Sequence, residues 1–420
     1  MPDRAIRRGF VLRTPSVILA VIALIASLMG PGAAAAQDFS AFLREMRAEA
    51  ASVGVTAATF DRETEGLTPD LSLPNLDLPG RRGPSNAGQS EFTLTPAQYL
   101  APKALAAQAA KGRQYLARHK QALAAIERRY GVPGSVVLAI WGRETAFGAA
   151  KVPYDAVRVL ATQAFVGRRK TEFRQEFLLA LKMLQDGAVS RAGLRSSWAG
   201  AIGLTQMLPS QYYKYGVDFD GSGRVDIWTS ETDALASIAN HLAGEGWVRG
   251  LDWALEVKPA AGFTCGHADP EEAMAVSRWL ARGFTVIGGK VPSATDRAAP
   301  ASLFMPAGAY GPAFLITRNY YVLKAYNFSD LYVLYVGHLA DLIDGGAAFA
   351  TPWQAAKQSS TAGIAAIQQE LARQGHYAET VDGRAGMKTR LAIGRYQEAR
   401  GLSVDCWPGD AVLKALQAAR

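Results

Sequence analysis

IWGRETAFG, the stretch at residues 140–148, places an acidic side chain in the apolar part of a predicted helix. Pro133 suits a first helical turn, and a helix that starts there carries Ile140, Trp141 and Glu144 on one face, three and four residues apart. A carboxyl group on such a face must find a partner or stay protonated near neutral pH, as a general acid does. Glu144 is therefore the residue to explain.

Two interpretations of Glu144 remain open at this point. Arg143 is adjacent in sequence, so it points in another direction on the helix and is a poor neutralising partner. Glu144 is then either a structural carboxyl that caps or bridges another segment, or the acid of an active site. Its sequence neighbours do not decide between the two.

The N-terminal segment predicts export. Four arginines precede an apolar run at residues 17–29, and four alanines at 33–36 precede Gln37. This order is typical of a secretory signal peptide cleaved after Ala36, and the run is too short to favour a membrane span. We expect a signal peptide at 1–36 and a periplasmic mature protein without a transmembrane segment.

The charge of the chain is mildly positive. The formal net charge is +8, and residues 1–36 hold four arginines and one aspartate, so the remainder is formally +5. A mild positive balance suits an exported protein that works near an anionic polymer. The basic residues are dispersed and form no recognisable nucleic-acid motif, which argues against a nucleic-acid partner.

Helical patterns dominate the chain and predict a mainly α fold. The helical segments are predicted at Phe39–Gly54, Pro96–Tyr130, Thr171–Asp186, Asp233–Gly244 and Glu271–Gly283, with further apolar runs at Leu315–Ala325 and Leu331–Ile343. A stretch rich in Pro and Gly at 67–86 predicts an irregular arm. After Gly345 the composition becomes that of a linker at 346–362, and a weak repeat within 363–420 indicates a small helical module.

A second motif supplies small and polar residues. SSWAGAIGLTQM, at 196–207, has glycines at 200 and 203 that allow close backbone approach, with Ser197 and Gln206 beside them.

Four motifs then occur in the order of a known family: IWGRETAFG, SSWAGAIGLTQMLPSQYYKYGVDFDGSG, ALASIANHLAGEGW and TRNYYVLKAYN. From about Asp38 to Gly345 the chain resembles the membrane-bound lytic transglycosylase B family, glycoside hydrolase family 103. The resemblance implies a lysozyme-like α-helical catalytic domain at 37–345 with a small β/metal-loop insertion. Unlike anchored members, this chain has no lipid-attachment cysteine near the predicted cleavage site.

The resemblance also assigns site residues. Glu144 matches the single catalytic acid/base of the family. The implied substrate-binding residues are Ser197, Gln206, Tyr326, Asn327 and the basic pair Arg168 and Arg169.

The implied reaction cleaves the β-1,4 bond between N-acetylmuramic acid and N-acetylglucosamine and closes a 1,6-anhydro ring on the muramic acid. It requires no cofactor, and the expected partner is the glycan strand of peptidoglycan, bound by a monomer. A noncatalytic wall-binding or scaffold protein and a lysozyme-like hydrolase remain as alternatives.

The segment DFDGSGRVD at 218–226 follows the spacing of a calcium loop, although Thr229 stands where such a loop has its bidentate Glu. The family has a related loop with a later Asp ligand, which Asp233 supplies by resemblance. The predicted structural calcium site comprises Asp218, Asp220, Ser222, Arg224 and Asp233. The alternative is a glycine-rich turn that binds nothing.

The C-terminal segment resembles a peptidoglycan-binding module through IAAIQQELARQGHY, VDGRAGMKTRLAIGRYQEARGL and VDCWPG. The last motif departs from the usual DGxxG, which places its ligand contacts in question. Cys265 and Cys406 can oxidise outside the cytoplasm, but they lie in different predicted domains, so their pairing stays open.

Overall fold

The computed structural model describes residues 31–78 and 90–418, and the side chains from residue 38 onward. The charged start and apolar run of the predicted signal peptide lie outside the described residues, as does residue 79 onward of the predicted irregular arm. None of the described helices has both the length and the apolar character that a membrane crossing needs.

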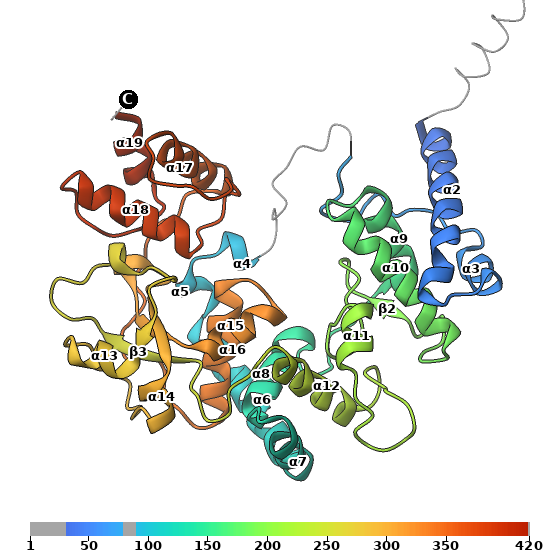
Figure 1. Cartoon of the computed structure of the whole chain (residues 1–420), viewed down its shortest axis with the longest axis horizontal. Coiled ribbons are helices and arrows are strands. Elements are labelled where there is room, and N and C mark those ends of the chain that lie inside the picture. Colours follow the sequence, from blue (N-terminus) through green and yellow to red (C-terminus); the bar gives the residue numbers. More distant parts are fainter. Residues whose placement is uncertain (1–30, 79–89, 419–420) are drawn as a thin grey trace, which may run out of the picture.

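An N-terminal helical layer lies at one side of the molecule (Figure 1). Its core contains Phe39, Phe60 and Phe177, and the predicted helices at 39–54 and 171–186 are confirmed within it. Its helices are α2 (Pro31–Ala50), α3 (Ala57–Thr64), α9 (Ala156–Val166), α10 (Lys170–Gln185) and α11 (Pro209–Tyr215).

A central bundle surrounds α8 (Gly134–Thr145), which packs against α6, α7, α12 and α16. Ten of its twelve residues are buried, which explains why it is apolar on nearly all faces. The predicted helical stretch 96–130 is three helices, because Pro102 starts a second helix and a turn at His119 separates the third. The bundle further comprises α4 (Ser90–Thr93), α5 (Pro96–Tyr99), α6 (Pro102–Arg118), α7 (Lys120–Tyr130), α12 (Glu231–Gly244), α15 (Arg318–Tyr326) and α16 (Asp330–Ile343).

The β insertion is a five-stranded antiparallel sheet of order β4-β6-β7-β3-β5. The helix predicted over 271–283 is confined to α13, because Met274 and Ala275 pair with Ala301 and Pro300 as a strand. The elements are β3 (Ala254–Lys258), β4 (Met274–Ala275), α13 (Val276–Ala281), β5 (Thr285–Val286), α14 (Ala294–Ala298), β6 (Pro300–Phe304) and β7 (Ala313–Ile316). A separate pair, β1 (Tyr154–Asp155) and β2 (Arg195–Ser196), links two loops.

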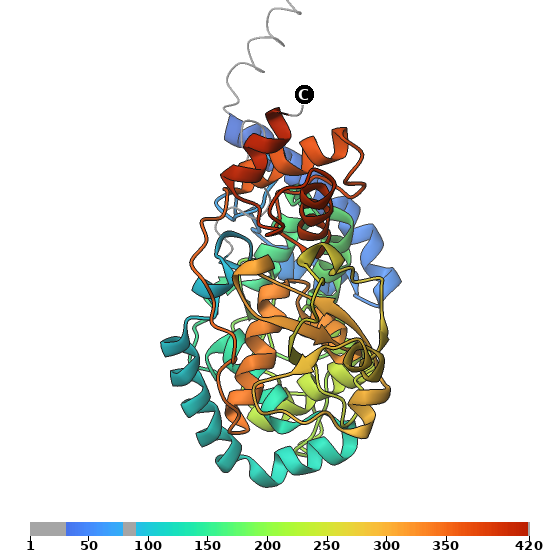
Figure 2. The ribbon, with the colours of Figure 1, turned by 90° about the vertical axis from the view of Figure 1, so that its left-hand side faces the viewer.

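The C-terminal segment forms three helices: α17 (Thr361–Arg373), α18 (Met387–Ala399) and α19 (Asp410–Ala418). Figures 1 and 2 both place this module above the sheet. Cys265, beside the sheet, and Cys406, in the module, form a disulfide, which settles the pairing that the sequence left open. Gly394 lies in α18, and a Cβ added to it would lie 2.5 Å from the Cys406 Sγ. The α18 helix therefore approaches the disulfide closely.

The predicted linker at 346–362 is bonded to the catalytic domain and to the C-terminal module. The backbone N–H groups of Ala350 and Thr351 donate to the Glu256 carboxylate, at 2.8 and 2.7 Å. Further along, the indole N–H of Trp407 donates to the Lys357 carbonyl. The segment therefore fixes the module instead of letting it move freely.

Candidate active site

Glu144 lies in the last turn of α8 and is half-buried. The hydroxyl of Tyr332, on α16, donates to its Oε1 at 2.5 Å. Tyr332 is itself buried, with 1% of its surface exposed. Because α8 and α16 pack along each other, the fold rather than a flexible loop sets this contact.

Burial raises the pKa of Glu144 to about 7, although the Tyr332 hydrogen bond and the charge of Arg143 act to lower it. Arg143 turns away from this carboxyl, as predicted: its Nη2 lies 2.5 Å from the Glu91 Oε1 and 2.5 Å from the Tyr99 hydroxyl. A group with such a pKa is protonated in about half of the molecules at neutral pH. Glu144 can therefore donate a proton and take one back.

The chain turns sharply just after Glu144. Ala146 and Phe147 have φ angles of 51° and 59°, in the left-handed region that costs a non-glycine residue about 1–3 kcal/mol. Phe147 holds the turn because its ring stacks on Tyr115 and meets Trp141 edge-on. Gly142 is needed for this packing, because a Cβ there would lie 2.6 Å from the Phe147 ring.

The 196–207 loop is bonded to the same turn. The Thr145 hydroxyl donates to the Leu204 carbonyl at 3.2 Å, and the Tyr326 hydroxyl donates to the Thr205 carbonyl at 2.6 Å. Gln206 follows with a φ of 52°, a further strained backbone position. Burial and the charge of Glu144 both raise the pKa of Tyr326. Tyr326 therefore lies near the acid, whereas the Gln206 amide donates to the Gly203 carbonyl at 3.0 Å. That either residue contacts a substrate stays a prediction.

The remaining predicted residues lie in different surroundings. The Ser197 hydroxyl accepts hydrogen bonds from the N–H groups of residues 199 and 201, so it shapes its own turn. Asn327 directly follows Tyr326, and its side-chain oxygen accepts the N–H of Ser329. Arg168 and Arg169 are exposed at the start of α10, where Arg169 pairs with Glu172. A contact between these arginines and a substrate stays a prediction.

Sequence reasoning missed Tyr332 and Glu91. Tyr332 stands in the apolar run 331–343, where it is hard to tell from an ordinary core residue. The available signal was its hydroxyl, since a buried tyrosine usually finds a hydrogen-bond partner. Glu91 gave no pattern, because it reaches Arg143 only through the tertiary fold.

The Asp218 loop forms a group of carboxylates. One oxygen each from Asp218, Asp220 and Asp233 lies within 4.8 Å of the others. Backbone N–H groups hold them: Asp218 accepts from Gly221, and Asp233 accepts from Phe219 at 2.8 Å. Three oxygen ligands so fixed fit a hard divalent cation such as calcium.

The other two residues predicted to bind the metal are Ser222 and Arg224, which lie in the same loop. The Ser222 hydroxyl donates to the Arg224 carbonyl at 3.2 Å, so both oxygens lie within the loop. Asp226 is turned away and accepts from the N–H groups of Trp228 and Thr229.

This loop also supports the acid. The Leu204 N–H donates to the Ile227 carbonyl at 2.8 Å, and Leu204 in turn accepts from Thr145, next to Glu144. Gly203 is needed at this contact, since a Cβ there would lie 2.8 Å from the Ile227 carbonyl.

We expect Tyr332→Phe to raise the pKa of Glu144 above about 7. The lost hydroxyl donates to the carboxylate, so its hydrogen bond favours the charged form, and removing it favours the proton. A carbon-13 NMR titration of the side-chain carboxyl measures the change. Tyr321→Phe is the matched control, because the Tyr321 hydroxyl contacts Ser302 instead. An unchanged or lower pKa in Tyr332→Phe would contradict the assignment.

Comparison with known proteins gives two matching families. The family described as "Transglycosylase SLT domain" matches residues 38–341, and "Putative peptidoglycan binding domain" matches residues 360–416. The "Membrane-bound lytic murein transglycosylase B" of Escherichia coli K12 is 31% identical over 216 residues, which are 51% of this chain and 58% of that protein.

Two solved structures are similar to this chain. SltB3 from Pseudomonas aeruginosa, in complex with NAG-anhNAM-pentapeptide, is 35% identical with a TM-score of 0.80, over 90% of this chain and 99% of that one. Escherichia coli SLT35, in complex with calcium, is 27% identical with a TM-score of 0.51, over 59% of this chain and 77% of that one.

Proposed function

Because this chain belongs to the transglycosylase SLT domain family, we propose that it is a lytic transglycosylase that cleaves peptidoglycan glycan strands. The observation that carries the proposal is the carboxyl of Glu144, whose pKa burial raises to about 7 and which accepts a hydrogen bond from the Tyr332 hydroxyl. The similarity to lytic transglycosylases supports the same activity.

In the proposed mechanism, protonated Glu144 donates its proton to the glycosidic oxygen between N-acetylmuramic acid and N-acetylglucosamine as that bond breaks. The resulting carboxylate accepts a hydrogen bond from Tyr332, which stabilises it. It then removes the proton from the muramoyl C6 hydroxyl, whose oxygen attacks C1 and closes the 1,6-anhydro ring. Glu144 ends protonated, and water takes no part.

The anomeric carbon also needs stabilisation while it carries positive charge. Ordinary glycosidases use a second carboxylate for this purpose. Here the 2-acetamido group of the substrate is the proposed stabiliser. Ser197, Gln206, Tyr326 and Asn327 are the proposed contacts that orient the sugars around the acid.

Digestion of purified sacculi tests this function. We expect the wild-type protein to release soluble muropeptides with 1,6-anhydro ends, identified by mass spectrometry. Reducing ends would indicate the lysozyme-like hydrolase. No soluble product would indicate the noncatalytic wall-binding or scaffold protein.

The pH dependence of kcat/KM should show one descending limb near pH 7. The free enzyme must hold the proton on Glu144, so the rate is flat below this pKa and falls about tenfold per pH unit above it. Initial rates on soluble glycan strands between acid and alkaline pH measure the profile. A rate that rises through pH 7 would mean that the carboxylate, not the acid, starts the reaction.

We also propose that Asp218, Asp220 and Asp233 hold a structural calcium ion, with Ser222 and the Arg224 carbonyl in the same loop. The reaction itself would need no metal or cofactor. Calcium at a hundred times its Kd would stabilise the fold by about 2.7 kcal/mol. We expect the ion to raise the Tm of the wild-type protein and EGTA to reverse the change.

Two variants separate ion binding from loop stability. Asp233→Asn should lose the calcium-dependent rise in Tm, because it removes a proposed ligand. Asp226→Asn should keep that rise, because Asp226 bonds the backbone outside the cluster. A Tm that calcium leaves unchanged in the wild-type protein would favour the simple turn.

The proposed organisation is a signal peptide at 1–36, a catalytic domain at 37–345, a linker at 346–362 and a peptidoglycan-binding module at 363–420. The module family match and the start of α17 at Thr361 support the last boundary. We propose that the mature protein works in the periplasm, since its proposed substrate lies outside the cytoplasm. We also propose that it is a monomer.

A further inference from the structure

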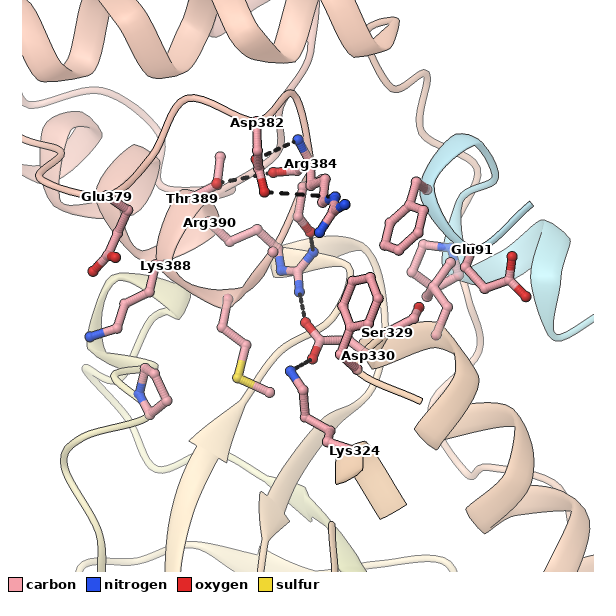
Figure 3. Close-up of a pocket in the computed structure, with 18 of the residues that line it drawn as sticks. Glu91, Lys324, Ser329, Asp330, Glu379, Asp382, Arg384, Lys388, Thr389 and Arg390 are labelled. Atoms are coloured by element: carbon pink, nitrogen blue, oxygen red, sulfur yellow. Dashed lines mark hydrogen bonds and ion pairs between the residues drawn. The ribbon is translucent and has the colours of Figure 1, made fainter. Parts of the chain in front are cut away.

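A pocket of about 450 Å³ lies between the catalytic domain and the C-terminal module (Figure 3). Its volume is within the usual range of small-ligand sites, about 300–1,000 Å³. The catalytic domain supplies residues from α4, α15 and α16, and the module supplies residues 377–390. Both parts are therefore needed to form the pocket.

The module is held firmly enough to contribute one wall. Besides the Cys265–Cys406 disulfide, Arg395 pairs with Asp269 at 2.9 Å and Lys388 pairs with Glu271. Each bond joins the module to the sheet region. The pocket is thus a fixed part of the molecule.

One wall of the pocket is aromatic. Phe92 and Phe328 stack with their ring centres 5.5 Å apart, and the Arg384 guanidinium lies 4.6 and 4.9 Å from those centres. Phe328 nevertheless keeps 55% of its surface exposed. An exposed ring at a pocket wall offers apolar contact to a ligand rather than to the core.

The floor of the pocket carries an excess of positive charge. Lys324 and Arg390 both pair with the one carboxylate of Asp330, at 2.7 and 3.4 Å, and their side chains are 28% and 9% exposed. Figure 3 shows these two cations reaching Asp330 from opposite sides. Two cations against one carboxylate, shielded from water, attract a further anionic group.

The pocket as a whole is balanced in charge. Its lining holds four carboxylates and four cations, so it suits neither a polyanion nor an uncharged sugar chain. The carboxylates are Glu91, Asp330, Glu379 and Asp382, and the cations are Lys324, Arg384, Lys388 and Arg390. A ligand with both carboxylate and ammonium groups, and with small apolar groups for the aromatic wall, matches this lining.

The pocket lining also has two links to residues near Glu144. Phe328 and Ser329, in its lining, directly follow Asn327. Glu91, on the same lining, pairs with Arg143, the residue before Glu144. One residue of the lining is therefore in direct contact with the sequence neighbour of the acid.

We propose that this pocket binds the stem peptide of the peptidoglycan strand, so that the enzyme prefers strands that carry peptides. Stem peptides combine carboxylates, the amine of a diamino acid and alanine methyl groups. The inference rests on the proposed function for its choice of polymer. It gives the module a direct part in substrate selection, beyond holding the enzyme near the wall.

Binding of a free stem peptide to the full-length protein tests the proposal directly. The probe is L-Ala-γ-D-Glu-meso-diaminopimelate-D-Ala, measured by isothermal titration calorimetry. We expect Arg384→Ala and Phe328→Ala each to weaken binding by about tenfold or more, as the loss of a wall contact does. Arg400→Ala is the matched control, because Arg400 lies over Tyr396 in the same module and outside the pocket lining.

A kinetic comparison gives the second readout. The ratio of kcat/KM for peptide-bearing strands to that for amidase-treated strands should fall toward one in Arg384→Ala and stay at the wild-type value in Arg400→Ala. No peptide binding by the wild-type protein, or equal losses in both arginine variants, would overturn the proposal. The peptide has no glycosidic bond, so its binding is independent of catalysis. A protein that binds it without cleaving strands would disprove the proposed function alone.

Discussion

Glu144→Gln should lower the rate of strand cleavage by about a hundredfold to ten-thousandfold, the usual contribution of a general acid or base. Glutamine keeps the shape of the side chain but has no acidic proton to give to the glycosidic oxygen. It also cannot take the proton of the C6 hydroxyl, so both steps fail in one variant. Release of soluble muropeptides, followed by chromatography over a long incubation, measures the loss.

Glu176→Gln is the matched control for this variant. Glu176 is a second carboxyl whose pKa burial raises, but it bonds to Ser210 at the start of α11. It should retain wild-type activity per folded molecule, with folding checked by circular dichroism. If Glu144→Gln kept more than about a tenth of the wild-type rate, another group would have to supply the proton.

Replacing both Cys265 and Cys406 by serine should lower the free energy of unfolding by about 2–5 kcal/mol. The disulfide joins positions 141 residues apart, and a link across so long a loop restricts the unfolded chain strongly. Chemical unfolding of the oxidised wild-type protein and of the double variant gives the difference.

Limited proteolysis would show which segment becomes accessible when the disulfide is removed. Cleavage should appear first in the segment 346–360, which has no helix or strand and joins the module to the domain. Cys265→Ser alone serves as a control, because it breaks the same link while keeping one thiol. A change below about 0.5 kcal/mol would mean that the ion pairs and the packed segment hold the module without the disulfide.

The α8 helix could be predicted because its signals are local. Pro133 sits at its N-cap, and Ile140, Trp141 and Glu144 recur at helical spacing. The chemistry of Glu144 could not be predicted from this pattern alone, since the same pattern also fits a structural carboxyl. Only the distant motifs around Gln206 and Tyr326 made the catalytic interpretation stronger.

Other features depend on contacts that no local pattern encodes. Tyr332 looks like one more apolar core residue in its helix until α16 packs on α8 and brings its hydroxyl to Glu144. The Cys265–Cys406 disulfide needs the module to dock on the sheet, so two cysteines in different predicted domains could not reveal it. The short strand at Met274 pairs with β6 and overrides a helical pattern.

Cleavage in water enriched in oxygen-18 tests the central claim most directly, namely that Glu144 acts alone as acid and then base while the substrate supplies its own nucleophile. The claim predicts anhydro products without the label, because the C6 oxygen of the muramic acid closes the ring. Products with one oxygen-18 atom at C1 would show that water attacks, and would contradict it.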